Sequence, residues 1–113
     1  MQMNENPIWS MVETKREAFI GLADRIFDMP EIAYTETRSC AEHTQMLRAE
    51  GFRIKENAAG IPTAVIGEAG QGGPVIAILG EYDALPGLSQ QPGLAEPKMV
   101  DTSGFGHGCG HNL

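Results

Sequence analysis

Three side chains that can bind a metal stand at alternate positions near the end of the sequence: His107, Cys109 and His111. Zinc prefers imidazole and thiolate ligands, and imidazole also binds manganese, cobalt and nickel. Gly108 and Gly110 separate the three. Glycine removes side-chain bulk and permits backbone angles that let ligands converge. Because a metal needs four or more donors, we expect a metal site whose remaining ligands come from a continuation of the chain.

The conformation of this tail decides which side chains can share a metal. In an extended segment all three project to the same side, whereas in a helix the two histidines share a face and Cys109 turns away. Binding through both Cys109 and His111 therefore requires a non-helical loop, which the glycines favour. A second chemistry stays open, in which the Cys109 thiolate is a nucleophile beside a histidine. The sequence shows no oxyanion hole or third orienting group for that reaction.

Two carboxylates, Glu81 and Asp83, follow directly after the apolar run 75–79. Open α/β sheets bind ligands at the carboxyl ends of their strands, so this position suits a site. The two residues are two apart, and on an extended segment both project to the same side. Such a pair can bind a cation or orient imidazole ligands. The alternative is that both are merely solvated acidic residues at a strand end.

Helices are expected in the first half of the sequence. Asn6 and Pro7 form a good helix start, with asparagine as the cap and proline at the first position. Apolar residues then recur at helical spacing, and Pro30 ends this helix. A second helix is expected from residue 35 or 37 to residue 50, and Gly51 fits the left-handed stop that follows it.

Strands and loops are expected after Gly51. Residues 52–55 and 63–66 are strand candidates, and the continuously apolar run 75–79 is predicted as a central strand buried on both faces. Residues 86–106 hold no periodic pattern, and an irregular stretch of that length is usually functional. The order predicts an α/β domain of three layers, with two helices followed by a mixed sheet, of which these residues are the opening part.

Charge and cysteine content limit the partners. Fifteen acidic and eight basic residues give a net charge of −7, and no basic stripe indicates nucleic acid or an anionic membrane surface. Acidic residues in the first thirty positions argue against a signal peptide, and no apolar run is long enough for a membrane span. The widely separated Cys40 and Cys109 favour a reduced, cytoplasmic protein.

Four stretches carry a resemblance to a known family: 29–36 (Met-Pro-Glu-Ile-Ala-Tyr-Thr-Glu), 51–52 (Gly-Phe), 74–86, and 107–112 (His-Gly-Cys-Gly-His-Asn). The sequence resembles the opening of the metal-dependent amidohydrolases and exopeptidases grouped with aminoacylase and glutamate carboxypeptidase. The most similar branch includes hydrolases of auxin–amino-acid conjugates and of aminobenzoyl-glutamate. Glu81 and Asn112 stand where that branch more often has Asp. These variants, with residues 87–91, favour the aminobenzoyl-glutamate hydrolases.

The resemblance implies that Cys109 and His111 are metal ligands, that Asp83 is a carboxylate behind or beside the ligands, and that Glu81 and His107 support the site. It implies two divalent ions, manganese or zinc, and a bridging water that attacks an amide carbonyl. Residues 1–113 would be the N-terminal portion of the catalytic domain. The general-base glutamate, further ligands and a dimerisation domain are expected downstream. The full-length protein is expected to dimerise or to pair with a related subunit.

The predicted function is therefore metal-dependent hydrolysis of the amide bond in N-acyl or N-aroyl amino acids, with a glutamate conjugate as the favoured substrate. Alone, residues 1–113 are expected to be inactive. One alternative is a non-catalytic metal-binding or interaction fragment, and another is a cysteine–histidine thiol enzyme. Removal of metal separates the hydrolase from the thiol enzyme, because only the hydrolase depends on it.

Overall fold

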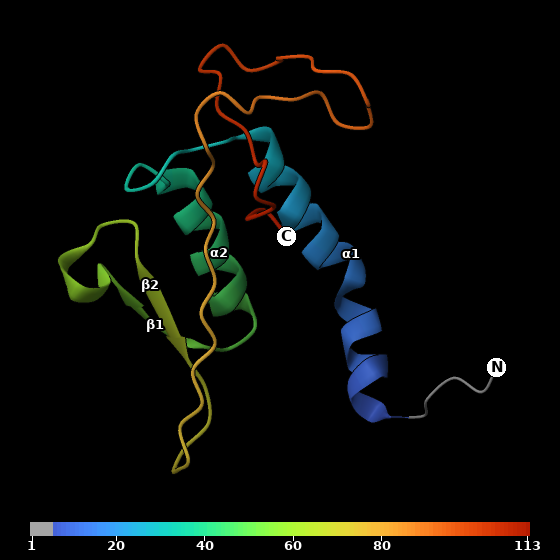
Figure 1. Cartoon of the computed structure of the whole chain (residues 1–113). Coiled ribbons are helices and arrows are strands. Elements are labelled where there is room, and N and C mark those ends of the chain that lie inside the picture. Colours follow the sequence, from blue (N-terminus) through green and yellow to red (C-terminus); the bar gives the residue numbers. More distant parts are fainter. Residues whose placement is uncertain (1–5) are drawn as a thin grey trace.

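The computed structural model describes residues 6–113, so the first five residues of the predicted domain lie outside the described part. Two helices come first and a small sheet follows (Figure 1). The elements are α1 (Pro7–Asp28), α2 (Thr37–Ala49), β1 (Arg53–Glu56), a short 3-10 helix η1 (Ala58–Gly60) and β2 (Val65–Glu68). This order confirms the predicted opening of an α/β domain.

Helix α1 begins as the sequence predicts. The Asn6 side chain accepts a hydrogen bond from the backbone N–H of Ile8 at 3.0 Å, and Pro7 is the first helical residue. Toward its carboxyl end α1 packs beside α2, and Ile26 is completely buried there. The ion pairs Lys15–Glu50 (2.7 Å) and Arg25–Glu42 (2.8 Å) join the two helices at the surface. The amino-terminal half of α1 extends away from the rest of the chain (Figure 1).

Helix α2 is stopped by the predicted glycine signal. Gly51 has a left-handed φ of 86°. The N–H of Phe52 donates to the carbonyl of Leu47 at 3.0 Å, and the N–H of Gly51 donates to that of Arg48 at 3.1 Å. This is the hydrogen-bond pattern of a Schellman motif. The helix ends at Ala49, one residue earlier than expected.

The start of α2 is stabilised by a residue from outside the helix. The cap residue Glu36 makes no capping bond with its side chain. Instead Glu31, which is buried, accepts hydrogen bonds from the backbone N–H groups of Ser39 (2.7 Å) and Arg38 (3.1 Å). Burial would raise the pKa of Glu31, but these bonds and those from the Ser39 and Arg38 side chains outweigh it and lower that pKa. The negative charge also suits a helix N-terminus.

The sheet consists of β1 and β2, which pair in antiparallel register from Arg53↔Glu68 to Glu56↔Val65. Both strands start one or two residues later than the sequence predicts. A Cβ atom placed on Gly67 would lie 3.1 Å from the Leu47 side chain of α2. The missing side chain at this position therefore lets the sheet pack closely against α2.

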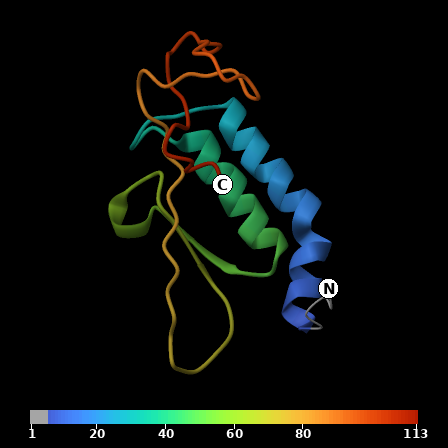
Figure 2. The same ribbon diagram turned by 45° about the vertical axis from the view of Figure 1, so that its right-hand side comes forward.

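The prediction of a central strand at 75–79 is wrong for this structure. Residues 74–80 form no strand, and Val75, Ile76, Ile78 and Leu79 are 83–97% exposed. Figures 1 and 2 draw this segment as a long extended trace without a strand arrow. A strand buried on both faces needs neighbouring strands and covering layers. Within residues 6–113 the two strands pair only with each other, so the apolar run has no partner.

The segment becomes anchored only at its carboxyl end. The N–H of Ala84 donates to the carbonyl of Glu31 at 2.7 Å, and Leu85 pairs with Gly106 in an antiparallel bridge. The Leu85–Gly106 bridge joins the two ends of the irregular stretch 86–106, which therefore forms a loop. Ser89 and Gln90 hold it together, since the Ser89 hydroxyl accepts from two backbone N–H groups and the Gln90 amide donates to three carbonyls within the stretch.

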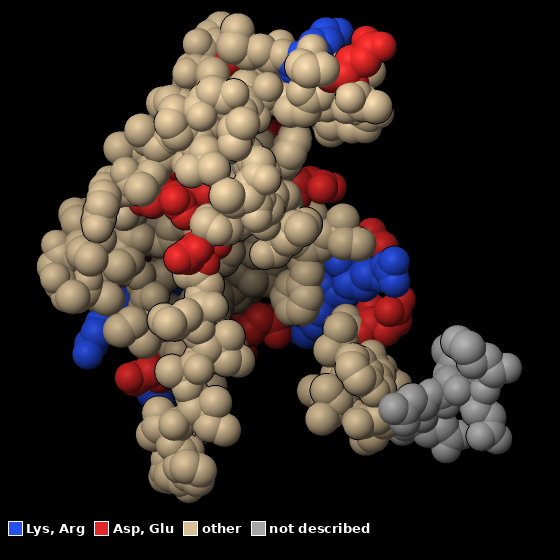
Figure 3. All heavy atoms as spheres, viewed as in Figure 1, with Lys and Arg blue, Asp and Glu red and all other residues tan. Residues whose placement is uncertain are grey.

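The surface agrees with the charge balance. Figure 3 shows basic side chains in separate places on this face, with acidic ones close by, and no continuous basic stripe there. Among residues 6–113 no helix is long and apolar enough to cross a membrane.

Candidate metal centre

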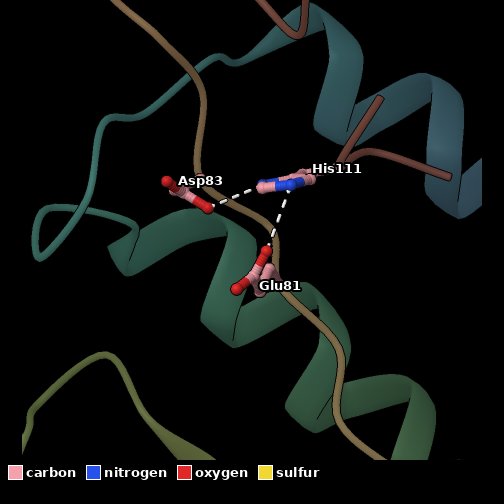
Figure 4. A group of neighbouring side chains, drawn as sticks. All are labelled: Glu81, Asp83 and His111. Carbon is pink, nitrogen blue, oxygen red and sulfur yellow. Dashed lines mark hydrogen bonds and ion pairs between the residues drawn. The ribbon is translucent and has the colours of Figure 1, made fainter. Parts of the chain in front are cut away.

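Three side chains from two distant parts of the sequence meet beside α1 and α2. Glu81 and Asp83 come from the end of the extended segment, and His111 comes from the tail (Figure 4). One ligand atom from each lies within 4.8 Å of the others. His111 Nδ1 is 2.8 Å from Asp83 Oδ1, and His111 Nε2 is 3.1 Å from Glu81 Oε2. The imidazole therefore lies between two carboxylates.

Alternation along the extended segment brings Glu81 and Asp83 to the same imidazole. Between them, Tyr82 interacts elsewhere: its hydroxyl donates to the Thr63 carbonyl, and its ring centroid lies 5.0 Å from that of His43. Burial raises the pKa of Tyr82, so its hydroxyl stays protonated as a donor. Docking of this ring fixes the rotation of the segment, and both carboxylates are left facing the tail.

The tail is a loop of turns and not a helix, which settles the alternative that the sequence left open. The glycines act there for two different reasons. A Cβ atom on Gly108 would lie 2.4 Å from the Leu88 side chain, so a larger residue there would require that side chain to move. Gly110 has a φ of 77°, a left-handed conformation that other residues rarely adopt. Gly108 therefore lies against Leu88, and Gly110 allows a left-handed turn within the tail.

The two carboxylates favour the charged form of His111. The hydrogen bond from His111 to Asp83 is the main reason why the pKa of His111 is raised, and the nearby charge of Glu81 raises it further. A carboxylate that accepts from one ring nitrogen fixes the tautomer and leaves the other nitrogen for a metal. Here Asp83 accepts from Nδ1, and Nε2 lies next to the Glu81 carboxylate. An imidazole nitrogen and a carboxylate oxygen are suitable donors for zinc or manganese.

Two other predicted site residues lie outside this cluster. Cys109 is exposed, and its thiol is not among the three converging ligand atoms. His107 is buried, with Nε2 3.1 Å from the carbonyl of Ile26 in α1. Burial lowers the pKa of His107, which favours its neutral form. Within residues 6–113 no hydrogen bond joins Cys109 to a histidine.

One contact of the tail carries no signal in the sequence. The Asn112 side-chain amide donates to the carbonyl of Ala23 at 3.4 Å. The two residues are separated by 89 positions, and no spacing rule relates a tail residue to a helix carbonyl so far away.

Comparison with known proteins supports the family resemblance. The chain is 48% identical to one subunit of p-aminobenzoyl-glutamate hydrolase of Escherichia coli (strain K12) over 102 residues, which are 90% of this chain and 21% of the relative. It is 28% identical to N-acetyl-L-cysteine deacetylase of Bacillus subtilis (strain 168), with 100% of this chain and 26% of the relative covered. It is 31% identical to Xaa-Arg dipeptidase of Mus musculus, with 90% and 22% covered.

No family model matches the sequence, and no solved structure matches the fold. The chain spans between a fifth and about a quarter of the length of these curated relatives. The three relatives are named as a hydrolase, a deacetylase and a dipeptidase. The expected similarity is thereby confirmed: the chain resembles the amidohydrolases and exopeptidases that these relatives represent.

Proposed function

We propose that this chain forms part of a divalent-metal centre in an enzyme that hydrolyses the amide bond of N-acyl or N-aroyl amino acids. The observation that supports this best is the placement of His111 between Asp83 and Glu81, with their ligand atoms within 4.8 Å of one another. The names of the three relatives support the reaction class.

The proposed roles follow from the contacts. Asp83 accepts from His111 Nδ1 and orients the ring, so that Nε2 is the metal ligand. Glu81 lies beside Nε2, and we assign it as a supporting carboxylate next to the metal ligand. Cys109 stands two residues before His111 in the same glycine-rich loop, and we include its thiolate as a second ligand. The remaining ligands and the general base are assigned outside residues 1–113, which would be the N-terminal portion of the catalytic domain.

A pair of manganese or zinc ions held at such a centre would lower the pKa of a water molecule and polarise the amide carbonyl. In this proposal the residues of this chain bind the metal ions and orient the ligand side chains. Asp83 keeps His111 in one tautomer, and the exposed Glu81 can accept a proton or orient a water beside the imidazole. A reducing, cytoplasmic setting would keep the Cys109 thiol available.

A glutamate conjugate is the favoured substrate. The relative with 48% identity is named for p-aminobenzoyl-glutamate, whereas the other two are named for N-acetyl-cysteine and an Xaa-Arg dipeptide. In each compound an amide joins an acyl group to an amino acid. Because the first of these relatives is named as one subunit of its hydrolase, pairing of the whole protein with a related subunit is also supported.

Isothermal titration of the metal-free chain with Mn²⁺ and Zn²⁺ tests the metal centre. We expect the parent to bind and His111→Ala to lose most of the affinity, whereas Glu96→Ala, which removes an exposed carboxylate outside the cluster, binds as the parent does. Equal affinity of the His111 variant and the parent would contradict the proposal.

Hydrolysis of p-aminobenzoyl-glutamate by the whole protein tests the reaction, with the released p-aminobenzoate as the readout. Hydrolysis that stops with a chelator and returns with Mn²⁺ or Zn²⁺ supports a metal enzyme. Hydrolysis that persists in chelator but stops after alkylation of Cys109 would favour the thiol enzyme. Metal binding without hydrolysis of any N-acyl amino acid would favour a binding protein.

A further inference from the structure

The loop that carries Cys109 and His111 is attached to α1 at two points, one on each side of these residues. Before them, His107 Nε2 lies 3.1 Å from the carbonyl of Ile26. After them, the Asn112 amide donates to the carbonyl of Ala23 at 3.4 Å. Ala23 and Ile26 are three residues apart, so their carbonyls lie on neighbouring turns of one face of the helix.

The carboxyl end of α1 is well suited to hold such donors. The last carbonyls of a helix have no partner within the helix, and they form the negative end of its dipole. Helix α1 ends at Asp28, which places the Ile26 carbonyl in the last turn. That carbonyl also accepts from the backbone N–H of Met29 at 3.2 Å. A side-chain N–H that approaches this turn is therefore attracted to it.

The environment of His107 fixes its ring. His107 is 8% exposed and Ile26 is 0% exposed. The Phe27 ring centroid lies 6.4 Å from the centroid of the His107 imidazole. Since a carbonyl only accepts, Nε2 must carry the hydrogen and donate to Ile26. His107 Nδ1 is buried and has no hydrogen-bond partner among the described residues. An unpartnered buried nitrogen is unfavourable for folding, so stability alone would favour an apolar residue here.

We propose that His107 and Asn112 are positioning residues, which hold the loop on the last turns of α1 so that His111 faces Asp83 and Glu81. This inference rests on the proposed metal centre. It assigns α1, which contributes no ligand itself, as the rigid support of the loop. The role of Asn112 requires its amide, because a carboxylate of the same shape could only accept and would face another acceptor.

The attachment can be tested without metal by amide hydrogen exchange of the whole 113-residue chain. His107→Phe keeps an aromatic ring but removes the donor, and Asn112→Asp keeps the shape but removes the amide. We expect the amides of Gly110 and Leu113, which are hydrogen-bonded within the loop, to exchange roughly three- to tenfold faster in both variants, as loss of one hydrogen bond predicts.

The control variant is His43→Phe. His43 also contacts a helix carbonyl, with Nδ1 3.1 Å from that of Ser39, but both residues belong to α2. We expect its loop amides to exchange as in the parent. His107→Gln serves as a rescue, because its amide can donate to Ile26. Unchanged loop exchange in both His107→Phe and Asn112→Asp would overturn the attachment.

Titration with Co²⁺, followed by absorption, tests whether the attachment positions the ligands. Loss of an outer-shell partner typically lowers metal affinity about tenfold to a hundredfold, and we expect this range for His107→Phe, with partial recovery in His107→Gln. Faster loop exchange with parent-like Co²⁺ affinity would overturn the positioning role. A parent chain that keeps a protected loop but binds no Co²⁺ would contradict the proposed metal centre, while the exchange data would still support the attachment.

Discussion

His111 Nδ1 lies 2.8 Å from Asp83 Oδ1, although 28 residues separate the two in sequence. The contact requires both the extended segment and the tail to reach the same place. The segment is held there by the bond between Ala84 and the Glu31 carbonyl, and the Leu85–Gly106 bridge brings the tail alongside. The cluster therefore depends on the backbone pairing of Ala84 and Leu85, the two residues that follow Asp83.

Replacement of Asp83 should lower the pKa of His111 in the metal-free chain. The hydrogen bond to Asp83 is the largest cause of the raised pKa. Asp83→Ala removes both bond and charge, whereas Asp83→Asn removes the charge and leaves an acceptor. We expect the pKa to fall toward its ordinary value of 6.5, further in the alanine variant, as measured by NMR titration of the imidazole. An unchanged pKa in both variants would show that the contact is not formed in solution.

The raised pKa of His111 also has a consequence for stability. Since the folded-state pKa lies above the unfolded value of 6.5, the ion pair stabilises the fold below that pH. This contribution is lost as the pH rises through the folded-state pKa. The Asp83→Ala variant should therefore differ from the parent more at about pH 6 than at about pH 9 in urea unfolding.

Glu31 should make the fold sensitive to acid. Its pKa is lowered from 4.5 by hydrogen bonds at the start of α2, so its contribution to stability is present above that value and disappears as the pH falls through the folded-state pKa. Glu31→Gln places an amide among donors and should reduce the free energy of unfolding by about 1–3 kcal/mol at about pH 7, as expected for bonds to a charged group. Urea unfolding at neutral pH measures this.

The control for Glu31 is Glu96→Gln, an exposed acidic residue in the irregular stretch. It should unfold as the parent does. If Glu31→Gln and the parent lost stability in parallel from about pH 7 to about pH 3, the carboxylate would not be the group responsible.

The apolar segment 75–79 should make the isolated chain self-associate. Its backbone groups are unpaired and its side chains are 83–97% exposed at four positions, which describes an open edge for strand addition. Ile78→Lys places a charge in the middle of that edge and should lower the fraction of oligomer measured by light scattering. Met11→Lys is the control, because Met11 is 68% exposed on a helix whose backbone is already hydrogen-bonded. Equal effects of both changes would indicate general hydrophobicity and not strand addition.

Local signals in the sequence were sufficient for the helices and their ends. Asparagine before proline, and glycine before phenylalanine, act through contacts within a few residues, so the start of α1 and the end of α2 were predictable. The contact of Glu31 with α2 was not, because its acceptor atoms reach backbone groups seven and eight residues away across a loop. No spacing rule describes that arrangement.

The candidate site was predictable only where local sequence signals determine it. The alternation of Glu81 and Asp83 follows from extended geometry, and the glycines of the tail indicated a loop. Which carboxylate contacts which ring nitrogen of His111 depends on where two distant segments dock. Local sequence patterns do not encode this docking. The run 75–79 was predicted as a buried strand from its composition alone. Composition describes what a segment would bury, but burial requires partners that residues 6–113 do not provide.

Gly106 should be the glycine that tolerates a side chain least. A Cβ atom there would lie 1.8 Å from the Leu88 carbonyl oxygen and 2.8 Å from the Ser89 nitrogen, both of which are backbone atoms that cannot rotate away. Gly106→Ala must therefore separate the tail from residues 88–89, and we expect the free energy of unfolding to fall by about 1–3 kcal/mol, as for other overpacked sites. Gly80→Ala is the matched control, since a Cβ atom at Gly80 meets no atom within 4 Å.

Because Gly106 also pairs with Leu85, just beyond Asp83, its substitution should weaken metal binding along with stability, whereas Gly80→Ala should leave stability unchanged. Thermal unfolding and Mn²⁺ titration of the two variants measure both effects, and parent-like stability of Gly106→Ala would show that the tail does not dock against residues 88–89 in solution.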